Sequence, residues 1–383
     1  MSAERSVRLV GLAQGDPGVT RTASGAAKFL LDALARHNTL VDRRSVELTP
    51  SQRNLIAAAT FHPSRERWRS RFYWWRQLAL DVRSRNSARA LAAVADPFDL
   101  AVQIFGLFRT RGAPYVIYID NTVQLSRAHW PPWVELEGRQ LERLYAWERR
   151  LYGDALRVFA AGRPHARSVS GFYGVPEERV TVVGAGANFE QLPDLTSSPR
   201  EPVVLFIGRD WRRKGGELLL EAFRSVRAEH PAARLQIVGT DEAPRGEPGV
   251  EVLGTIESRS RLVELYAAAQ VFCLPSHYDP YGLSISEAMA YGLPCVVTRV
   301  GALDEVVLDG VTGLVVPPDD ATALSGALSR LIADPRLARS LGAAGRQRVE
   351  EHQNWDAVAC RMAPGLAEAA RSARAAHVQA PGL

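Results

Sequence analysis

The sequence predicts an α/β protein made of two Rossmann-like, doubly wound domains that face a cleft. Three observations carry this prediction. Short Val-, Ile- and Leu-rich runs alternate with helical periodicity over almost all of the 383 residues, a pattern typical of parallel sheets covered on both faces. The alternation starts again after a polar segment near the middle of the chain. The length itself fits two domains at roughly 100–200 residues each.

Eleven short apolar runs are the candidate strands. In the first half they are 7–13, 99–105, 113–119, 157–161 and 179–183, and in the second half 202–207, 233–239, 250–254, 271–274, 294–298 and 312–316. Helical periodicity lies between them at 24–36, 135–151, 216–229, 259–269, 284–291, 320–333 and 336–350. Strands separated by helices in this order build doubly wound sheets.

Segment 191–201 is polar and contains Pro and Ser, and a fresh strand and a Gly-containing turn follow it. We therefore expect it to link an N-terminal domain over 1–190 to a C-terminal domain over 202–363. The stretch 364–383 is Ala-rich and poor in large apolar residues. That composition favours a frayed helix or a disordered tail.

The composition is that of an ordinary globular protein, with 46% hydrophobic and 23% charged residues. A net charge of +5 is too small to indicate nucleic-acid binding, and we expect none. We expect neither a signal peptide nor a membrane helix, because no charged leader or long apolar run occurs. Three cysteines, 22 and 65 residues apart, fit neither a paired-Cys zinc site nor a disulfide scaffold. We expect a cytoplasmic protein.

The strongest motif is the segment 276–294. A strand ends before it, a loop with Pro and Gly follows, and a helix begins near Ser284. The free amides at a helix start form an anion site. Asp279 lies on the loop and Glu287 about one turn into the helix, so one carboxylate can accept from a sugar hydroxyl while the other takes a ribose diol. The alternative is a capped helix with a structural Glu.

The second motif is the segment from Gly208 to Gly215, between a strand and a helix. Arg209 and Lys214, five residues apart on one loop, can bracket a diphosphate. Of the 47 basic residues only two are lysines, which fits a place where a compact ammonium is wanted. The alternative is a basic, solvated loop.

A weaker signal lies in Gly15-Asp16-Pro17-Gly18 and in Ser24-Gly25 before the first helix. It indicates either a loop that approaches a phosphate or sugar, or a plain turn. The glycine triplet of dinucleotide sites is absent, so we do not expect NAD binding. No Asp-x-Asp and no histidine pair at metal-ligand spacing occurs, so we expect no metal site.

The string from Asp279 to Glu287, continued by Glu-Ala-Met-Ala-x-Gly-x-Pro, resembles the Glu–seven–Glu motif of the retaining glycosyltransferases of family 4, which have the GT-B fold. The segment 208–215 is similar to the donor-phosphate loop of that family. The segment 301–318 resembles the same family. The resemblance is specific over about 200–350. It is fainter over 1–190, where Ser24-Gly25 and 183–188 carry it.

This resemblance implies transfer of a sugar from a nucleotide-diphosphate donor, with retention and without a metal. The nucleotide-sugar, of UDP or GDP type, is then a substrate, and no cofactor is expected. By position, Arg209 and Lys214 would hold the diphosphate and Asp279 would touch the donor sugar. The donor-binding residues would be Gly208, Gly282, Leu283, Ser284, Glu287 and Gly25. The family usually has Glu where this chain has Asp279, which weakens the inferred sugar contact.

The first domain would take the acceptor, a carbohydrate, lipid-linked or small molecule. Segment 61–90 holds eight arginines and two acids, with aromatics between them. It suits an anionic membrane surface or a lipid-phosphate acceptor, which would place the protein peripherally at the inner face of the membrane. The alternative is a surface helix with solvated arginines. Other functions of the same fold are a nucleotide-sugar isomerase or hydrolase, or a binding protein without turnover.

Asp120 follows strand 113–119, at the end of the strand that should face the cleft. It could bind a donor-sugar hydroxyl or the acceptor, act as a nucleophile on the anomeric carbon, or cap the turn. We favour the binding role, because the chemistry implied by the resemblance needs no nucleophile.

Overall fold

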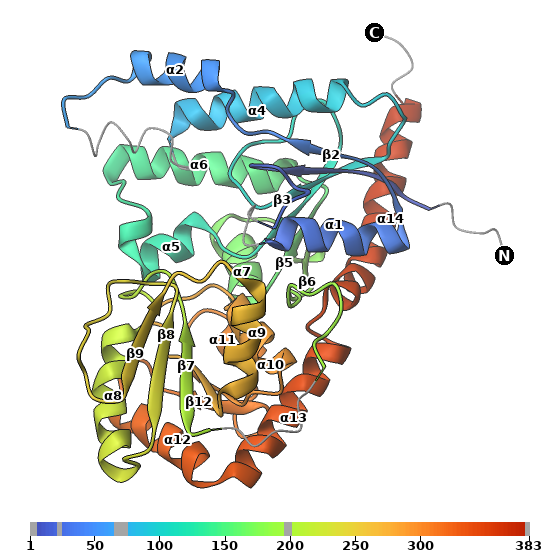
Figure 1. Cartoon of the computed structure of the whole chain (residues 1–383). Coiled ribbons are helices and arrows are strands. Elements are labelled where there is room, and N and C mark those ends of the chain that lie inside the picture. The colour runs from blue at the N-terminus through green and yellow to red at the C-terminus, as the bar shows by residue number, and fades with distance from the viewer. Residues whose placement is uncertain (1–5, 21–24, 65–75, 195–200, 380–383) are drawn as a thin grey trace, which may run out of the picture. The chain divides into compact units, whose positions relative to one another are not determined.

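A computed structural model gives the structure of the protein and describes residues 6–20, 25–64, 76–194 and 201–379. The chain divides into two compact units (Figure 1). Unit 1 comprises residues 1–184 together with 355–383, and unit 2 comprises residues 185–354. Each unit holds a six-stranded sheet whose paired strands are all parallel. The α/β prediction with two parallel sheets is confirmed.

The sheet of unit 1 has the strand order β2-β1-β3-β4-β5-β6. Its strands are β1 (Arg8–Ala13), β2 (Thr39–Ser45), β3 (Leu100–Ile104), β4 (Tyr115–Ile119), β5 (Arg157–Ala160) and β6 (Val180–Val182). Its helices are α1 (Ala26–His37), α2 (Pro50–Ala59), α4 (Gln77–Ala92), α5 (Val123–His129), α6 (Gly138–Asp154), α7 (Arg163–Arg167) and α14 (Trp355–Gln379). The strand order reverses between β1 and β3, where open α/β sheets bind ligands at the carboxyl edge.

The sheet of unit 2 has the order β12-β11-β10-β7-β8-β9, with its reversal between β7 and β10. Its strands are β7 (Val203–Ile207), β8 (Arg234–Val238), β9 (Val250–Gly254), β10 (Val271–Leu274), β11 (Cys295–Thr298) and β12 (Gly313–Val316). Its helices are α8 (Gly216–Glu229), α9 (Arg259–Ala268), α10 (Leu283–Ala290), α11 (Leu303–Val306), α12 (Ala321–Ala333) and α13 (Pro335–Glu351). The loops after β7 and β10 are therefore neighbours at the carboxyl edge.

All eleven predicted strands and all seven predicted helices are present, with ends shifted by a few residues. The sequence did not predict β2. This edge strand reads Thr-Leu-Val-Asp-Arg-Arg-Ser, and none of its side chains is fully buried. An edge strand needs no apolar face on its open side, so the pattern that identifies buried strands is missing.

The expectation of a frayed or disordered tail over 364–383 is wrong for the described part of that segment. Helix α14 runs beside α1 in unit 1 (Figure 1), and Leu366 is fully buried. Arg374 forms an ion pair with Asp99 at 2.7 Å, and Arg157 pairs with Glu368. Beside Leu366, this part of the helix buries Ala369, Ala370 and Ala373, and because alanine is small it allows close packing.

The borders of the units also differ from those expected. Unit 2 begins at Ala185, before the expected linker 191–201, and ends at Asn354 rather than at 363. The amide of Ala187 donates to the carbonyl of Gln353 at 2.8 Å, which joins the two ends of unit 2.

Within the described ranges, no helix is long and apolar enough to cross a membrane. The centre of the basic segment 61–90, residues 65–75, lies outside the described residues. In the described remainder, Phe61 is largely exposed, whereas Arg83 is buried and pairs with Glu47 at 3.0 Å. At Arg83 the expectation of a solvated arginine is therefore wrong.

Candidate functional site

An ion-pair cluster lies where the loops after β7 and β10 meet in unit 2. The Lys214 ammonium donates to Asp279 Oδ2 at 2.9 Å, and Arg213 Nη1 lies 3.5 Å from the same oxygen. Arg213 Nη1 also donates to the carbonyl of Tyr278 at 2.8 Å. The amide of His277 donates to the carbonyl of Arg213 at 2.9 Å, which ties the two loops together. Two loops far apart in sequence thus share one buried carboxylate.

The charges of this cluster fix the protonation state of Asp279. Burial raises the pKa of its carboxyl, but the charges of Lys214 and Arg213 outweigh burial and leave that pKa below its usual value. Arg213 also pairs with Asp210 at 3.0 Å, so two carboxylates hold its guanidinium in place. Lys214 gives one of its three donors to Asp279, which leaves donors for a ligand.

Two glycines permit the close approach of these loops. Gly215 has φ 74°, and a Cβ there would lie 1.9 Å from the carbonyl oxygen of Pro275. Gly301 has φ 56°, and a Cβ there would lie 1.9 Å from the carbonyl oxygen of Asp279. Only glycine combines a positive φ with the missing side chain, so the backbone holds Lys214 and Asp279 within reach of each other.

Helix α10 begins directly after this cluster with open donors. Gly282 is its N-cap with φ 77°, and no side chain caps the helix start. Within the described chain, the Ser284 hydroxyl is buried and has no hydrogen-bond partner. An uncapped helix start with an unsatisfied hydroxyl is suited to an anion.

Glu287 lies one turn further along α10, beside aromatic rings. The Tyr266 hydroxyl donates to Glu287 Oε2 at 3.4 Å, and the Tyr266 and Tyr291 rings stack with centroids 4.8 Å apart. Burial raises the pKa of Glu287 to about 7, against the opposing charge of Arg259. Near neutral pH this carboxyl is therefore divided between its two protonation states.

The predicted residues of the second domain gather at the carboxyl edge of unit 2, on the loop after β7 and at the start of α10. They are Gly208, Lys214, Asp279, Gly282, Leu283, Ser284 and Glu287. Arg209 differs from them, because it is exposed and forms no ion pair with the described residues. The sequence missed Arg213, since nothing in the run Arg212-Arg213-Lys214 shows which arginine turns inward. Asp210, three residues before Arg213 and bonded to it, is the one signal that could have shown it.

Asp120 and Gly25 lie in unit 1. Gly25 is the N-cap of α1 with φ 90°, while Ser24 lies outside the described residues. Asp120 lines a cavity of about 630 Å³ at the carboxyl edge, which is also lined by residues that follow β1 and β3. This is the reversal of strand order in unit 1, so the cavity occupies the ligand-binding position of an open α/β sheet.

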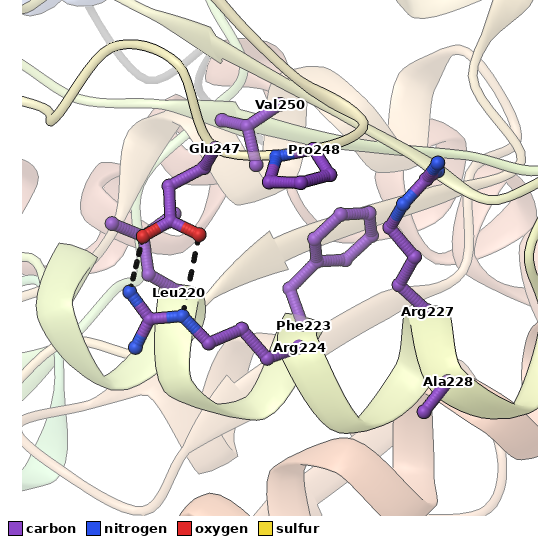
Figure 2. Close-up of a pocket in the computed structure, with 8 residues that line it drawn as sticks. All are labelled: Leu220, Phe223, Arg224, Arg227, Ala228, Glu247, Pro248 and Val250. Carbon is purple, nitrogen blue, oxygen red and sulfur yellow. Dashed lines mark hydrogen bonds and ion pairs between the residues drawn. The ribbon is translucent and has the colours of Figure 1, made fainter.

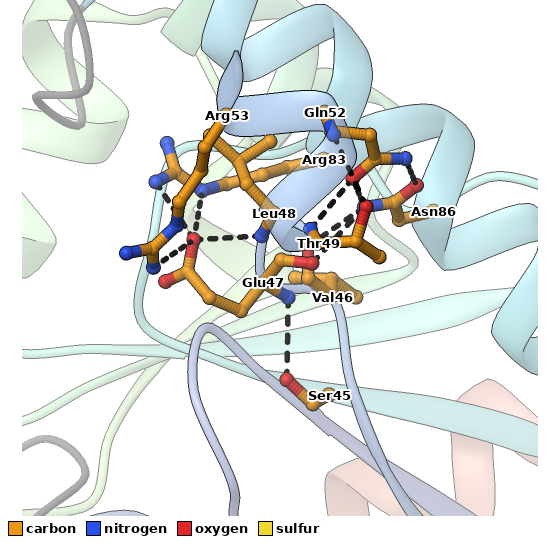
Figure 3. Close-up of polar contacts among 9 residues, drawn as sticks. All are labelled: Ser45, Val46, Glu47, Leu48, Thr49, Gln52, Arg53, Arg83 and Asn86. Atoms are coloured by element: carbon orange, nitrogen blue, oxygen red, sulfur yellow. Dashed lines mark hydrogen bonds and ion pairs between the residues drawn. The ribbon is translucent and has the colours of Figure 1, made fainter. Parts of the chain in front are cut away.

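Glu47, after β2, is another carboxylate of that cavity, and its neighbours hold it firmly (Figure 3). It accepts from the amide of Leu48 at 2.8 Å and from Arg83 at 3.0 Å, and Arg53 lies 3.7 Å away. Burial raises the pKa of Glu47, but these donors and charges lower it by a larger amount. The pKa of Glu47 therefore lies below its usual value.

A smaller cavity of about 270 Å³ lies between α8 and the segment before β9 in unit 2 (Figure 2). Arg224 and Glu247 form an ion pair across it. It lies at the amino end of β9, opposite the edge where parallel sheets bind ligands, so we do not count it in the candidate site.

Comparison with known proteins finds a family model that matches unit 2 and curated relatives that match part of the chain. Residues 187–348, nearly all of unit 2, match the family described as glycosyl transferases group 1. The chain is 30% identical over 250 residues to the MMP alpha-(1->4)-mannosyltransferase of Mycolicibacterium hassiacum, which covers 63% of this chain and 60% of that protein. It is 33% identical over 224 residues to the alpha-maltose-1-phosphate synthase of Mycobacterium tuberculosis, covering 54% and 58%. The matches thus span about three fifths of these relatives.

Solved structures show the same fold over nearly all of the chain. The sucrose-phosphate synthase from Thermosynechococcus elongatus has a TM-score of 0.69 at 22% identity and covers 95% of this chain and 100% of that one. Anabaena Alr3699/HepE in complex with UDP and glucose has a TM-score of 0.63 at 18% identity, covering 94% and 100%. The chain has the GT-B fold of these structures, and within it residues 187–348 of unit 2 match the glycosyl transferases group 1 model.

Proposed function

We propose that the protein is a retaining glycosyltransferase that moves a sugar from a nucleotide-diphosphate donor to an acceptor hydroxyl without a metal ion. The observation that carries this proposal is the Lys214–Asp279 pair beside the uncapped start of α10. An ammonium with spare donors and a row of helix amides together form a diphosphate site.

The costly step of such a reaction is departure of the diphosphate, whose oxygens gain charge in the transition state. Lys214 and the amides of α10 would neutralise that charge from fixed positions, which requires no reorganisation at the moment of reaction. Asp279, ionised at neutral pH, would accept from a hydroxyl of the donor sugar. A leaving phosphate oxygen can take the acceptor proton, so retention needs no protein nucleophile.

Glu287 would accept from the ribose hydroxyls of the nucleotide. The flat Tyr266–Tyr291 pair beside it makes this end of the site partly apolar, as nucleoside sites are. The cavity of unit 1 would take the acceptor, a carbohydrate or a lipid-linked or cell-envelope glycan. Contact of segment 61–90 with the inner face of a membrane stays part of this proposal.

A direct test is binding of UDP, GDP and ADP by calorimetry, followed by NMR of the anomeric proton in the product. We expect the UDP or GDP series to bind and the product to keep the donor's configuration. An inverted product would contradict the retaining assignment. Donor cleavage that is equally fast with and without acceptor extracts would identify a hydrolase instead.

We expect Glu287→Gln to weaken binding of the bare nucleoside diphosphate by about 10–100-fold at pH 8, the scale of hydrogen bonds to a charged group. In the native protein the carboxylate is the stronger acceptor and forms as pH rises through about 7. Nucleotide affinity should therefore rise between pH 6 and pH 8, and in the variant this rise should shrink to the part contributed by the ligand's own terminal phosphate, which ionises at about pH 6. Calorimetry at both pH values measures it. An unchanged dissociation constant would show that Glu287 is structural.

The same substitution, which we expect to weaken nucleotide binding, should increase the stability of the folded protein. Because burial raises the pKa of Glu287 above the usual 4.5, the folded protein loses stability as pH rises from there to about 7. Glutamine cannot ionise, so the variant should be more stable than the native protein at pH 8, by about 3 kcal/mol. Melting curves at pH 5 and pH 8 test this, with Glu221→Gln, an exposed position on α8, as the matched control.

A further inference from the structure

At the start of helix α5, in the wall of the unit 1 cavity, side chains of the protein itself accept the hydrogen bonds of the backbone amides. The first amide of the helix, that of Val123, donates to the Glu148 carboxylate at 3.0 Å. The amide of Gln124 donates to the Tyr173 hydroxyl at 3.1 Å, and that of Leu125 to the Thr122 hydroxyl at 3.2 Å. The amides that a phosphate would otherwise use are therefore already satisfied.

Glu148 comes from α6, is fully buried and takes the place of an anion at that helix start. Besides Val123, it accepts from the Tyr152 hydroxyl at 2.6 Å and from the Tyr173 hydroxyl. Burial raises its pKa to about 7, while these hydrogen bonds oppose the shift. A group held by three donors, two of which lie on other segments of the chain, does not move aside for a ligand at low cost.

The remaining wall of the cavity is suited to an uncharged ligand. Carboxylates and side-chain amides supply acceptors and donors for hydroxyl groups, and aromatic rings supply flat apolar surface; they include Glu47, Asp120, Asn121, Gln14, Phe105 and Trp133. Among the described residues that line the cavity there is no Lys, Arg or His. Recognition of a phosphate in proteins uses cations or free amides. Carboxylates and aromatic rings with a few polar groups recognise neutral polyhydroxy compounds.

We propose that this cavity accepts an uncharged polyol or glycoside and discriminates against its phosphorylated counterpart, with Glu148 as the residue that sets this specificity. The inference rests on the proposed function and narrows its acceptor class. It separates this chain from a group 1 relative whose name specifies a phosphorylated compound, the D-inositol 3-phosphate glycosyltransferase of Streptomyces bingchenggensis, 30% identical over 255 residues.

Direct binding tests the proposal without the need for turnover. Saturation-transfer NMR of the whole protein would compare three matched pairs: methyl α-glucoside with glucose 1-phosphate, methyl α-mannoside with mannose 1-phosphate, and myo-inositol with myo-inositol 1-phosphate. We expect at least one uncharged member to bind and its phosphorylated partner to bind at least about tenfold more weakly, as expected for an anion facing fixed carboxylates. A phosphorylated member that binds as tightly as its partner would overturn the proposal. So would failure of every uncharged member to bind up to its solubility limit.

The role of Glu148 is tested separately at pH 8, above its pKa of about 7, with Glu148→Gln, which keeps the shape and removes the charge. The ratio of the dissociation constants of the phosphorylated and the uncharged member of a pair should fall by about tenfold. The matched control is Glu142→Gln, an exposed position on the same helix, and it should leave the ratio unchanged. An unchanged ratio in Glu148→Gln, or the same shift in the control, would remove Glu148 from the proposal. The preference of the native protein remains measurable even if the variant folds poorly.

Failure of this inference is distinguishable from failure of the proposed function. Nucleotide binding is measured in unit 2 by calorimetry, whereas acceptor preference is measured with no nucleotide present. A protein that binds UDP or GDP and prefers phosphorylated ligands would keep the function and lose the inference. A protein that prefers uncharged ligands but binds no nucleotide would do the reverse.

Discussion

Lys214→Ala should lower kcat by about 10²–10³-fold, the scale for loss of one preorganised group that stabilises transition-state charge. The structure adds a second consequence. Asp279 would keep only Arg213 as a cationic partner, at 3.5 Å, so unfolding free energy should fall by about 1–3 kcal/mol, as for a hydrogen bond to a charged group. Initial rates at saturating donor, measured well below the melting temperature, separate the two effects.

The chain offers a matched control for this variant. Lys28, the other lysine, pairs with Asp32 on α1 in unit 1, and Lys28→Ala should leave kcat close to native. Arg209→Ala should also lower turnover if its exposed side chain reaches the diphosphate. Activity should persist in EDTA. Native kinetics in both Lys214→Ala and Arg209→Ala would refute the diphosphate assignment.

Asp120→Asn should lower activity by about 10–10³-fold, the range for one contact or one acid–base partner. Asp120 lies at the carboxyl end of β4 and lines the unit 1 cavity, where it can accept from a sugar hydroxyl. Asparagine keeps the shape and loses the charge, so the loss should appear in steady-state rates with donor and acceptor together. Asp96→Asn, at an exposed position in the same unit, serves as the control.

The binding role and the nucleophilic role of Asp120 differ in one observable. Binding leaves no covalent trace, whereas a nucleophile would carry the sugar after incubation with donor alone. Intact-mass spectrometry of the native protein should show no addition. A mass increase of one hexose on a peptide that contains Asp120 would establish double displacement. Full activity in the variant would favour a residue that only caps the turn.

The sequence predicted most of the fold because each buried strand carries its own signal. Strands such as β7 are continuous apolar runs between helices, and only one topology class suits that pattern. The pattern failed where burial is partial or side chains are small. The edge strand β2 carries Asp42, Arg43 and Arg44. Beyond residue 363, α14 buries Leu366 but otherwise packs through alanines, so this part of the helix has few of the large apolar residues by which a core element is recognised.

The candidate site divides in the same way. Lys214, Asp279 and Glu287 lie in two ordered strings of residues, so local spacing was enough to single them out. The cavity of unit 1 is assembled from loops after β1, β2, β3 and β4 together with α5 and α6. No short sequence motif identifies this cavity. Of its lining residues, only Asp120 could be found by its position at the end of a strand. Glu148 sits inside an amphipathic helix, and its role depends on contacts with Val123 and Tyr173 that spacing does not reveal.

Helix α14 has a consequence for biosynthesis. Unit 1 takes its last helix from residues made after the whole of unit 2, because synthesis proceeds from the N-terminus. While the ribosome translates 185–354, α14 has not yet been synthesised, so the surfaces of α1 and β5 that it covers stay exposed. Chaperones can bind this apolar surface, and it can also form wrong contacts. Unit 2, which is continuous in sequence, can close first. Stop codons or proteolytic cuts just after residue 354 would therefore damage the N-terminal half of the molecule rather than the half they adjoin.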